Sequence, residues 1–183
     1  MLRNTDQSWG APAKLLHWTI AALVFVQIAL GWAAVSWRLS PMKLDLFVWH
    51  KSTGLLILAL MVVRVAWRVV NVAPSLPADI ASLERRIARA SHVLLYLLLL
   101  LMPMTGWVVH SAANIPFRMF WLIPLPAIVA PDKATADLAA RAHYAIFVVL
   151  SVLLAVHIGA AFRHHFRKRN DVLMRMLPGK RSP

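Results

Sequence analysis

Four long apolar runs dominate the pattern of hydrophobic and polar positions along the chain. They cover residues 15–37, about 45–70, about 90–109 and about 142–162. Each run is close to or above the roughly 20 residues that a helix needs to cross the hydrocarbon core of a bilayer. The first run is too long for the hydrophobic part of a signal peptide and lacks a convincing cleavage site, so a retained helix is expected. The pattern predicts an all-α integral membrane four-helix bundle.

Two regions of this pattern need a closer reading. The uncharged part of the second run is only the twelve residues 52–63, and Arg64 and Arg68 are expected to extend to the headgroups where the helix leaves the hydrocarbon. The segment 110–140 is apolar enough for a fifth span, but Pro116, Pro124, Pro126 and Arg118 interrupt it. Its aromatic residues suit the membrane interface. A connection between the third and fourth helices is therefore predicted there.

Composition agrees with a membrane protein. The chain is 60% hydrophobic and 15% charged, with a mean hydropathy of +0.65, whereas soluble domains are about 45–50% apolar and about 25% charged. The net charge of +13 does not indicate a nucleic-acid partner, because the basic residues lie between and after the apolar runs rather than on one face. Cysteine is absent, which excludes disulfides, thiolate-bound haem and iron–sulfur clusters bound by the chain.

The distribution of basic residues predicts the orientation in the membrane. With four spans, both termini and the second loop share one side, which holds fourteen of the 20 lysines and arginines. The other six lie on the opposite side: Arg38, Lys43, Lys51, Arg118, Lys133 and Arg141. The positive-inside rule then places both termini in the cytoplasm. We expect residues 1–183 to form a single membrane domain that ends in a basic cytoplasmic tail, residues 163–183.

Five histidines lie inside or at the start of the predicted spans, and four of them form two pairs by depth. His143 and His157 are fourteen residues apart in the fourth run, so on a helix they share nearly one face and differ in depth by about 21 Å. His17 begins the first helix on the cytoplasmic side, which we call the inner side. His50 begins the second helix on the opposite, outer side. At the inner level His17 therefore pairs with His157. At the outer level His50 pairs with His143.

Paired histidines on facing helices are typical of haem sites in bundles, because haem iron takes one ligand on each side of the ring. Two b-type haems are predicted, bound non-covalently because no CxxCH motif exists. Glycines accompany these positions, and their small size suits either a haem or close helix packing: Gly31, Gly54, Gly106 and Gly159. Plain hydrogen bonding between helices is the alternative, and a non-redox transporter is the function that would go with it. Zinc fits less well because its ligands cluster tetrahedrally.

For the other four histidines the sequence gives weaker evidence of a role as haem ligands. His92 lies at the inner level, where a competing ligand, a contact to a quinone headgroup and an ordinary bundle residue are all open. His110 ends the third helix on the outer side and is expected to be solvated. His164 and His165 follow the last span within a basic run, so a surface position is expected.

Several motifs resemble those of the bacterial cytochrome b561 family of di-haem inner-membrane proteins. They are LLHW at 15–18, the histidine at 50, LMVVRVAWR at 60–68, PSLP at 74–77, LLYLLLLLMPMTGW ending at 107, HYAIFVVLSVLLAVH at 143–157 and HHFRKRNDVLMRMLP at 164–178. Their order and spacing cover most of the chain. The resemblance implies a location in the bacterial inner membrane. It also implies the haem ligands that depth selects: His17, His50, His143 and His157.

The resemblance also implies an activity. A characterised member of the family looks like a superoxide oxidase, which takes an electron from superoxide on the periplasmic side and reduces ubiquinone. Basic residues near the outer haem would raise the local concentration of this anion, and Lys51, Arg38 and Arg141 are the candidates for this steering. The alternative is an electron-transfer subunit that relays electrons between quinone and a separate redox partner protein.

Overall fold

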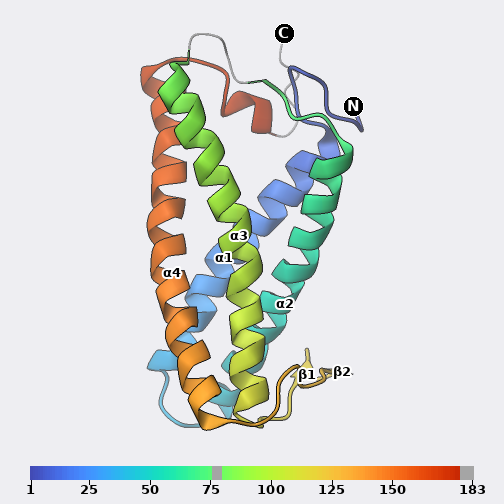
Figure 1. The fold of residues 1–183 in the computed structure, drawn as a ribbon, viewed down its shortest axis with the longest axis vertical. Helices are drawn as coiled ribbons and strands as arrows, with labels where there is room; N and C mark the ends of the chain where they lie inside the picture. Colours follow the sequence, from blue (N-terminus) through green and yellow to red (C-terminus); the bar gives the residue numbers. More distant parts are fainter. Residues whose placement is uncertain (76–79, 178–183) are drawn as a thin grey trace.

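The computed structural model describes residues 1–75 and 80–177 as a bundle of long helices (Figure 1). The long helices are α1 (Ala11–Ser36), α2 (Pro41–Val70), α3 (Ser82–Ala112) and α4 (Lys133–Phe162). Each is long and apolar enough to cross a membrane. The predicted all-α membrane four-helix bundle is therefore confirmed.

The helices extend beyond the apolar runs, chiefly at their N-terminal ends. Helix α2 begins at Pro41 rather than near residue 45, and the Ser40 side chain caps its free backbone N–H groups. Helix α4 begins nine residues before the predicted span, where the Asp132 carboxylate accepts a hydrogen bond of 2.7 Å from the backbone N–H of Thr135. Hydropathy detects only the part of a helix that lies in hydrocarbon. It does not detect the polar, capped first turns that precede that part.

The helices pack as two pairs of sequence neighbours. Helix α1 packs along α2, helix α3 packs along α4, and α2 and α3 join the two pairs. Two apolar clusters hold the pairs together: Ile20, Val24, Ile57 and Met61 between α1 and α2, and Leu95, Leu98 and Leu150 between α3 and α4. Within the part of the chain that the structure describes, α4 makes only sparse backbone contact with α1 and α2. Histidine side chains occupy the region between them.

The connection between α3 and α4 folds against the end of the bundle opposite the termini (Figure 1). It contains a small antiparallel hairpin of β1 (Arg118–Met119) and β2 (Ile123–Pro124). The backbone N–H of Phe120 donates a 2.8 Å hydrogen bond to the hydroxyl of Ser52 on α2. The segment is thus a connection rather than a fifth span, as predicted.

The two ends of the described chain meet at the other end of the bundle. The Lys14 ammonium donates to the backbone carbonyl of Leu177 at 3.0 Å, and the Trp18 indole N–H donates to that of Met176 at 2.8 Å. Between α4 and these contacts lie a π-helical turn, η1 (Arg163–Arg167), and a short 3-10 helix, η2 (Met174–Met176). Residues 178–183 of the predicted tail lie outside the described residues.

Candidate functional site

The structure brings the four histidines together as two pairs at opposite ends of α4. The rings of His50 on α2 and His143 on α4 have centres 6.3 Å apart and planes inclined by 74°. The rings of His17 on α1 and His157 on α4 have centres 6.4 Å apart and planes inclined by 68°. We call the first the outer pair and the second the inner pair.

Both separations suit one metal ion between two rings. An imidazole nitrogen binds such an ion at about 2 Å, and the ring centre lies about 1 Å beyond that nitrogen, so two rings on opposite sides of one ion have centres about 6 Å apart. The pairs measure 6.3 and 6.4 Å. Haem iron is held by axial ligands of this kind. Each pair could therefore hold a haem iron.

Glycines leave room for the rings of the outer pair. A Cβ atom on Gly31 would lie 2.9 Å from Cε1 of His50, and one on Gly106 would lie 3.3 Å from Cε1 of His143. Each glycine belongs to the helix that precedes the helix of its histidine. By contrast, a Cβ atom on Gly159 would meet nothing within 4 Å. A Cβ atom at residue 31 would force the His50 ring to shift, one at residue 106 would crowd the His143 ring, and one at residue 159 would disturb nothing.

A hydrogen bond selects the protonated nitrogen of His143. The Thr105 hydroxyl donates its single hydrogen to the backbone carbonyl of Met102 at 2.8 Å, and its oxygen lies 3.0 Å from Nδ1 of His143. It must therefore accept a hydrogen from His143 Nδ1, which leaves the lone pair on Nε2. Metal-binding histidines are commonly held in this way by a partner on the opposite ring nitrogen. The environment of His143 thus fits a metal ligand.

His50, the other member of the outer pair, is held through Gln27. The Gln27 side-chain amide donates to the backbone carbonyl of His50 at 2.9 Å and lies 3.3 Å from its Nε2. Nδ1 of His50 is buried and has no hydrogen-bond partner among the described residues. Because the amide nitrogen only donates, Nε2 of His50 is the acceptor in this contact, and the hydrogen of the neutral ring lies on Nδ1. A buried N–H without a partner is costly, and coordination of a metal ion through Nε2 would require Gln27 to give up its contact.

The inner pair has a cationic environment. Nη2 of Arg64 lies 3.2 Å from Nδ1 of His17, and Nε of Arg64 donates to the Tyr96 hydroxyl at 2.8 Å. Because arginine only donates, Nδ1 of His17 is the acceptor in this contact. The ring of His92 has its centre 5.4 Å from that of His157. A third imidazole and a guanidinium thus lie against the inner pair.

The expectation that Arg64 extends to the headgroups is wrong. Its guanidinium points into the bundle, because the Tyr96 hydroxyl and the His17 ring there accept hydrogen bonds from it. Arg68 lies one turn further along α2 and is exposed, with its guanidinium over the rings of Trp9 and Tyr96.

The three candidate steering residues differ in exposure. Lys51 follows His50 on α2 and is half-buried, with its ammonium 5.5 Å from the centre of the Phe117 ring. Arg38 in the α1–α2 connection and Arg141 on α4 are exposed. Lys51 is therefore held close to the outer pair by packing, whereas the two arginines contribute charge from the surface.

The expected solvation of His110 is wrong. Its side chain is only 4% exposed and packs against Phe117, with ring centres 5.4 Å apart. The α3–α4 connection folds back over the end of α3 and covers it. His164 and His165 lie half-buried in η1, and Asn170 is 3.0 Å from Nδ1 of His164.

Gln27, Thr105 and the inward direction of Arg64 were missed from the sequence. Each was visible as a polar residue inside an otherwise apolar run, and such residues usually face the interior of the bundle. That rule marks them as residues that could face the bundle interior, but it does not say which histidine each one contacts.

Comparisons with known proteins identify the family of this chain. The family model for prokaryotic cytochrome b561 matches residues 8–179. The chain is 34% identical to "Cytochrome b561 homolog 2" of Escherichia coli (strain K12), over 98% of this chain and 95% of that protein. It is 26% identical to "Probable superoxide oxidase CybB" of Yersinia pestis, over 91% of this chain and 94% of that protein. The chain therefore belongs to the prokaryotic cytochrome b561 family, whose members bind haem b and transfer electrons in the membrane.

Proposed function

We propose that this chain is a di-haem b-type cytochrome with one haem at each histidine pair. His50 and His143 would hold the outer haem, and His17 and His157 the inner one. The observation that carries the proposal is the separation of the ring centres, 6.3 and 6.4 Å, in two pairs that share α4. Plain hydrogen bonding between the rings would not require the glycines that accommodate the outer pair.

The chain's own residues bind and orient, while bound haem supplies the one-electron chemistry that side chains lack. Thr105 keeps the hydrogen of His143 on Nδ1, so Nε2 is available as a ligand. Gly31 and Gly106 let the outer rings approach the neighbouring helices. Arg64 places a positive charge at the inner pair.

We further propose that both termini face the cytoplasm of a bacterial inner membrane and that the chain forms one membrane domain. The support is the excess of basic residues on the side of the termini, fourteen against six. A reporter that is active only in the periplasm, fused after residue 183, should be inactive, and one that is active only in the cytoplasm should be active. The opposite result would place the outer pair on the cytoplasmic side.

We propose oxidation of superoxide near the outer pair and reduction of ubiquinone as the activity. Two superoxide anions each lose one electron and leave as oxygen, while ubiquinone gains the two electrons and two protons to become ubiquinol. Lys51, Arg38 and Arg141 support this activity, because positive charge at that end raises the local concentration of an anion. The name of the 26%-identical relative points the same way.

The alternative is an electron-transfer subunit that works with a separate redox partner protein. The 34%-identical relative is named only as a cytochrome b561 homolog, so its name adds no support for superoxide. Both functions use the same histidines, and they differ only in whether the isolated chain consumes superoxide.

The purified chain separates these functions in one set of measurements. Haem is counted per chain, and ubiquinone reduction is followed during enzymatic superoxide generation, with a protein-free sample to subtract the direct reaction. Two haems with superoxide-dependent ubiquinol formation are expected. Two haems without superoxide consumption would support the electron-transfer subunit, and a haem count near zero would overturn the cytochrome in favour of a transporter.

A further inference from the structure

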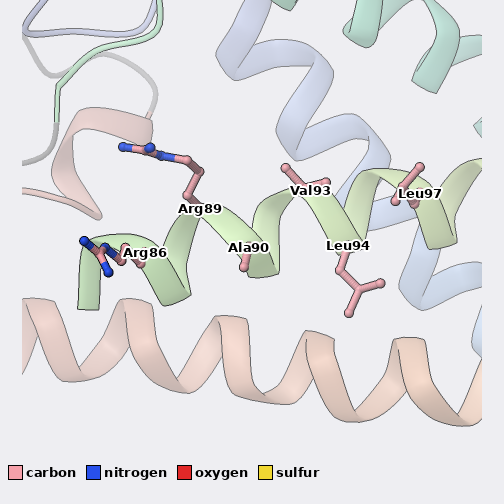
Figure 2. Close-up of a pocket in the computed structure, with 6 residues that line it drawn as sticks. All are labelled: Arg86, Arg89, Ala90, Val93, Leu94 and Leu97. Carbon is pink, nitrogen blue, oxygen red and sulfur yellow. The ribbon is translucent and has the colours of Figure 1, made fainter. Parts of the chain in front are cut away.

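A groove of about 430 Å³ lies on α3, near the end of the bundle where the termini meet (Figure 2). Two arginines and four apolar residues line it: Arg86, Arg89, Ala90, Val93, Leu94 and Leu97. In Figure 2 the arginines lie at one end of this row and Leu97 at the other. The groove thus joins a basic end to an apolar end.

The spacing of these residues places them on the outer face of the bundle. Residues three, four and seven positions apart share one side of a helix. The residues that line the groove are exposed, and Leu95, which is buried in the α3–α4 cluster, projects from the opposite side of α3. From Arg89 to Leu97 the helix rises about 12 Å. With Arg89 at the level of the lipid headgroups, Leu97 therefore reaches well into the hydrocarbon.

The basic end of the groove retains its positive charge. Glu84, one turn before, is paired with Arg163 at 3.2 Å and with Lys168. No ion pair among residues 1–75 and 80–177 includes Arg86 or Arg89. The carboxylate on the first turn of α3 is thus engaged elsewhere, and Arg86 and Arg89 line the basic end of the groove.

We propose that this groove binds an anionic diacyl phospholipid. Its phosphate pairs with Arg86 and Arg89, and an acyl chain lies along the apolar row that ends at Leu97. Arginine suits a phosphate because its planar group donates two parallel hydrogen bonds. Basic pockets on membrane helices bind lipid headgroups in this way.

The position of the groove favours a lipid over a quinone. His92, which contacts the inner pair, and Tyr96, which contacts Arg64, are half-buried and do not line the groove, whereas the residues that line it are exposed. A quinone also lacks the fixed negative charge that two arginines would select. The inference is independent of the redox activity.

The test measures lipid binding to the full-length protein in a neutral detergent by native mass spectrometry. The probe is dioleoyl phosphatidylglycerol, with dioleoyl phosphatidylcholine for comparison. The double variant Arg86→Gln/Arg89→Gln should bind phosphatidylglycerol at least about tenfold more weakly than the native chain. Arg85→Gln removes a neighbouring charge that does not line the groove, and it should keep native affinity. Phosphatidylcholine should bind both proteins equally.

Several outcomes would overturn the proposal. Equal losses in the Arg86→Gln/Arg89→Gln and Arg85→Gln variants would indicate general attraction rather than a site. Displacement of the lipid by millimolar inorganic phosphate would indicate a phosphate site without acyl recognition, and displacement by ubiquinone would indicate a quinone site. If the double glutamine variant fails to fold, the variant Arg86→Lys/Arg89→Lys replaces it in the test. This variant keeps both positive charges and should retain most of the native binding of phosphatidylglycerol.

Discussion

The two histidine pairs have nearly the same ring separation but different surroundings. At the outer pair, Gly31 and Gly106 leave room for the rings and the neutral side chains of Gln27 and Thr105 make the hydrogen bonds. At the inner pair, Arg64 makes the hydrogen bond. The bundle therefore leaves room for the outer rings and fixes the tautomer of His143, and it surrounds the inner pair with positive charge.

The difference has a consequence for metal binding. His143 already has its hydrogen on Nδ1 and a free lone pair on Nε2. The lone pair on Nδ1 of His17 is engaged by Arg64, so its neutral ring has the hydrogen on Nε2. Coordination through either nitrogen of His17 requires Arg64 to give up this contact. By the same reasoning, the Gln27 amide nitrogen only donates and engages the lone pair on Nε2 of His50. We therefore expect His143 to bind a metal ion without rearrangement, and His50 and His17 only after Gln27 and Arg64 give up these contacts.

The largest effect is expected from removing one ligand of each pair. His50→Ala should lower the haem content from about two to about one per chain by loss of the outer haem, and His157→Ala should do the same by loss of the inner one. Haem quantification with optical and paramagnetic resonance spectra of each variant would identify the remaining haem. Loss of the same haem in both variants would refute the assignment of two separate pairs.

A smaller effect is expected from filling the space behind an outer ring. A methyl group at residue 31 would lie 2.9 Å from the His50 ring, so Gly31→Ala should weaken binding of the outer haem by about tenfold, the scale seen when groups that orient ligands are disturbed. Gly159→Ala is the matched control, because its methyl group meets nothing within 4 Å. Haem titration of the apoprotein measures both. Equal affinities in the two variants would contradict the role of Gly31.

The tautomer of His143 can be tested at Thr105. Thr105→Val keeps the shape of the side chain but removes the oxygen that accepts from Nδ1, so the affinity for the outer haem should fall by roughly tenfold. Thr105→Ser keeps the hydroxyl and should retain most of the affinity. If valine and serine give the same affinity, the hydrogen bond does not orient His143.

The smallest effect concerns the positive charge at the inner pair. Arg64→Gln removes a cation that favours the electron-rich reduced state, so the midpoint potential of the inner haem should fall by on the order of 50 mV. The outer potential should stay nearly constant. Arg68→Gln removes an exposed charge one turn away and should have a smaller effect. A redox titration with spectral separation of the haems would check this, and an equal fall in both potentials would show that Arg64 acts at long range only.

The fold could be predicted from the sequence because membrane crossing depends on the length and polarity of local segments. The helix boundaries could not be predicted in this way, because Ser40 and Asp132 cap polar turns that hydropathy does not detect. The pairing of histidines could be proposed from depth alone. The contact of Thr105 with His143 could not, because the two residues are 38 positions apart and meet only through the packing of α3 on α4.

The burial of His110 and the direction of Arg64 were mispredicted for the same reason. Both residues lie near the ends of helices, where hydropathy indicates exposure. Neighbouring segments decide otherwise: Phe117 covers His110, and Tyr96 on α3 draws Arg64 inward. Polar residues near helix ends are thus placed by contacts that become visible only when the helices are assembled.

The arrangement of the helices also bears on how the protein is made. The α1–α2 and α3–α4 pairs are hairpins of sequence neighbours, and each can enter the membrane as a unit during synthesis. Each histidine pair takes one member from the first hairpin and one from α4. If each pair binds a haem as proposed, cofactor insertion would join the two halves of the molecule, and we expect a cell short of haem to accumulate inserted hairpins that are held together mainly by α2 and α3 and open to membrane proteases.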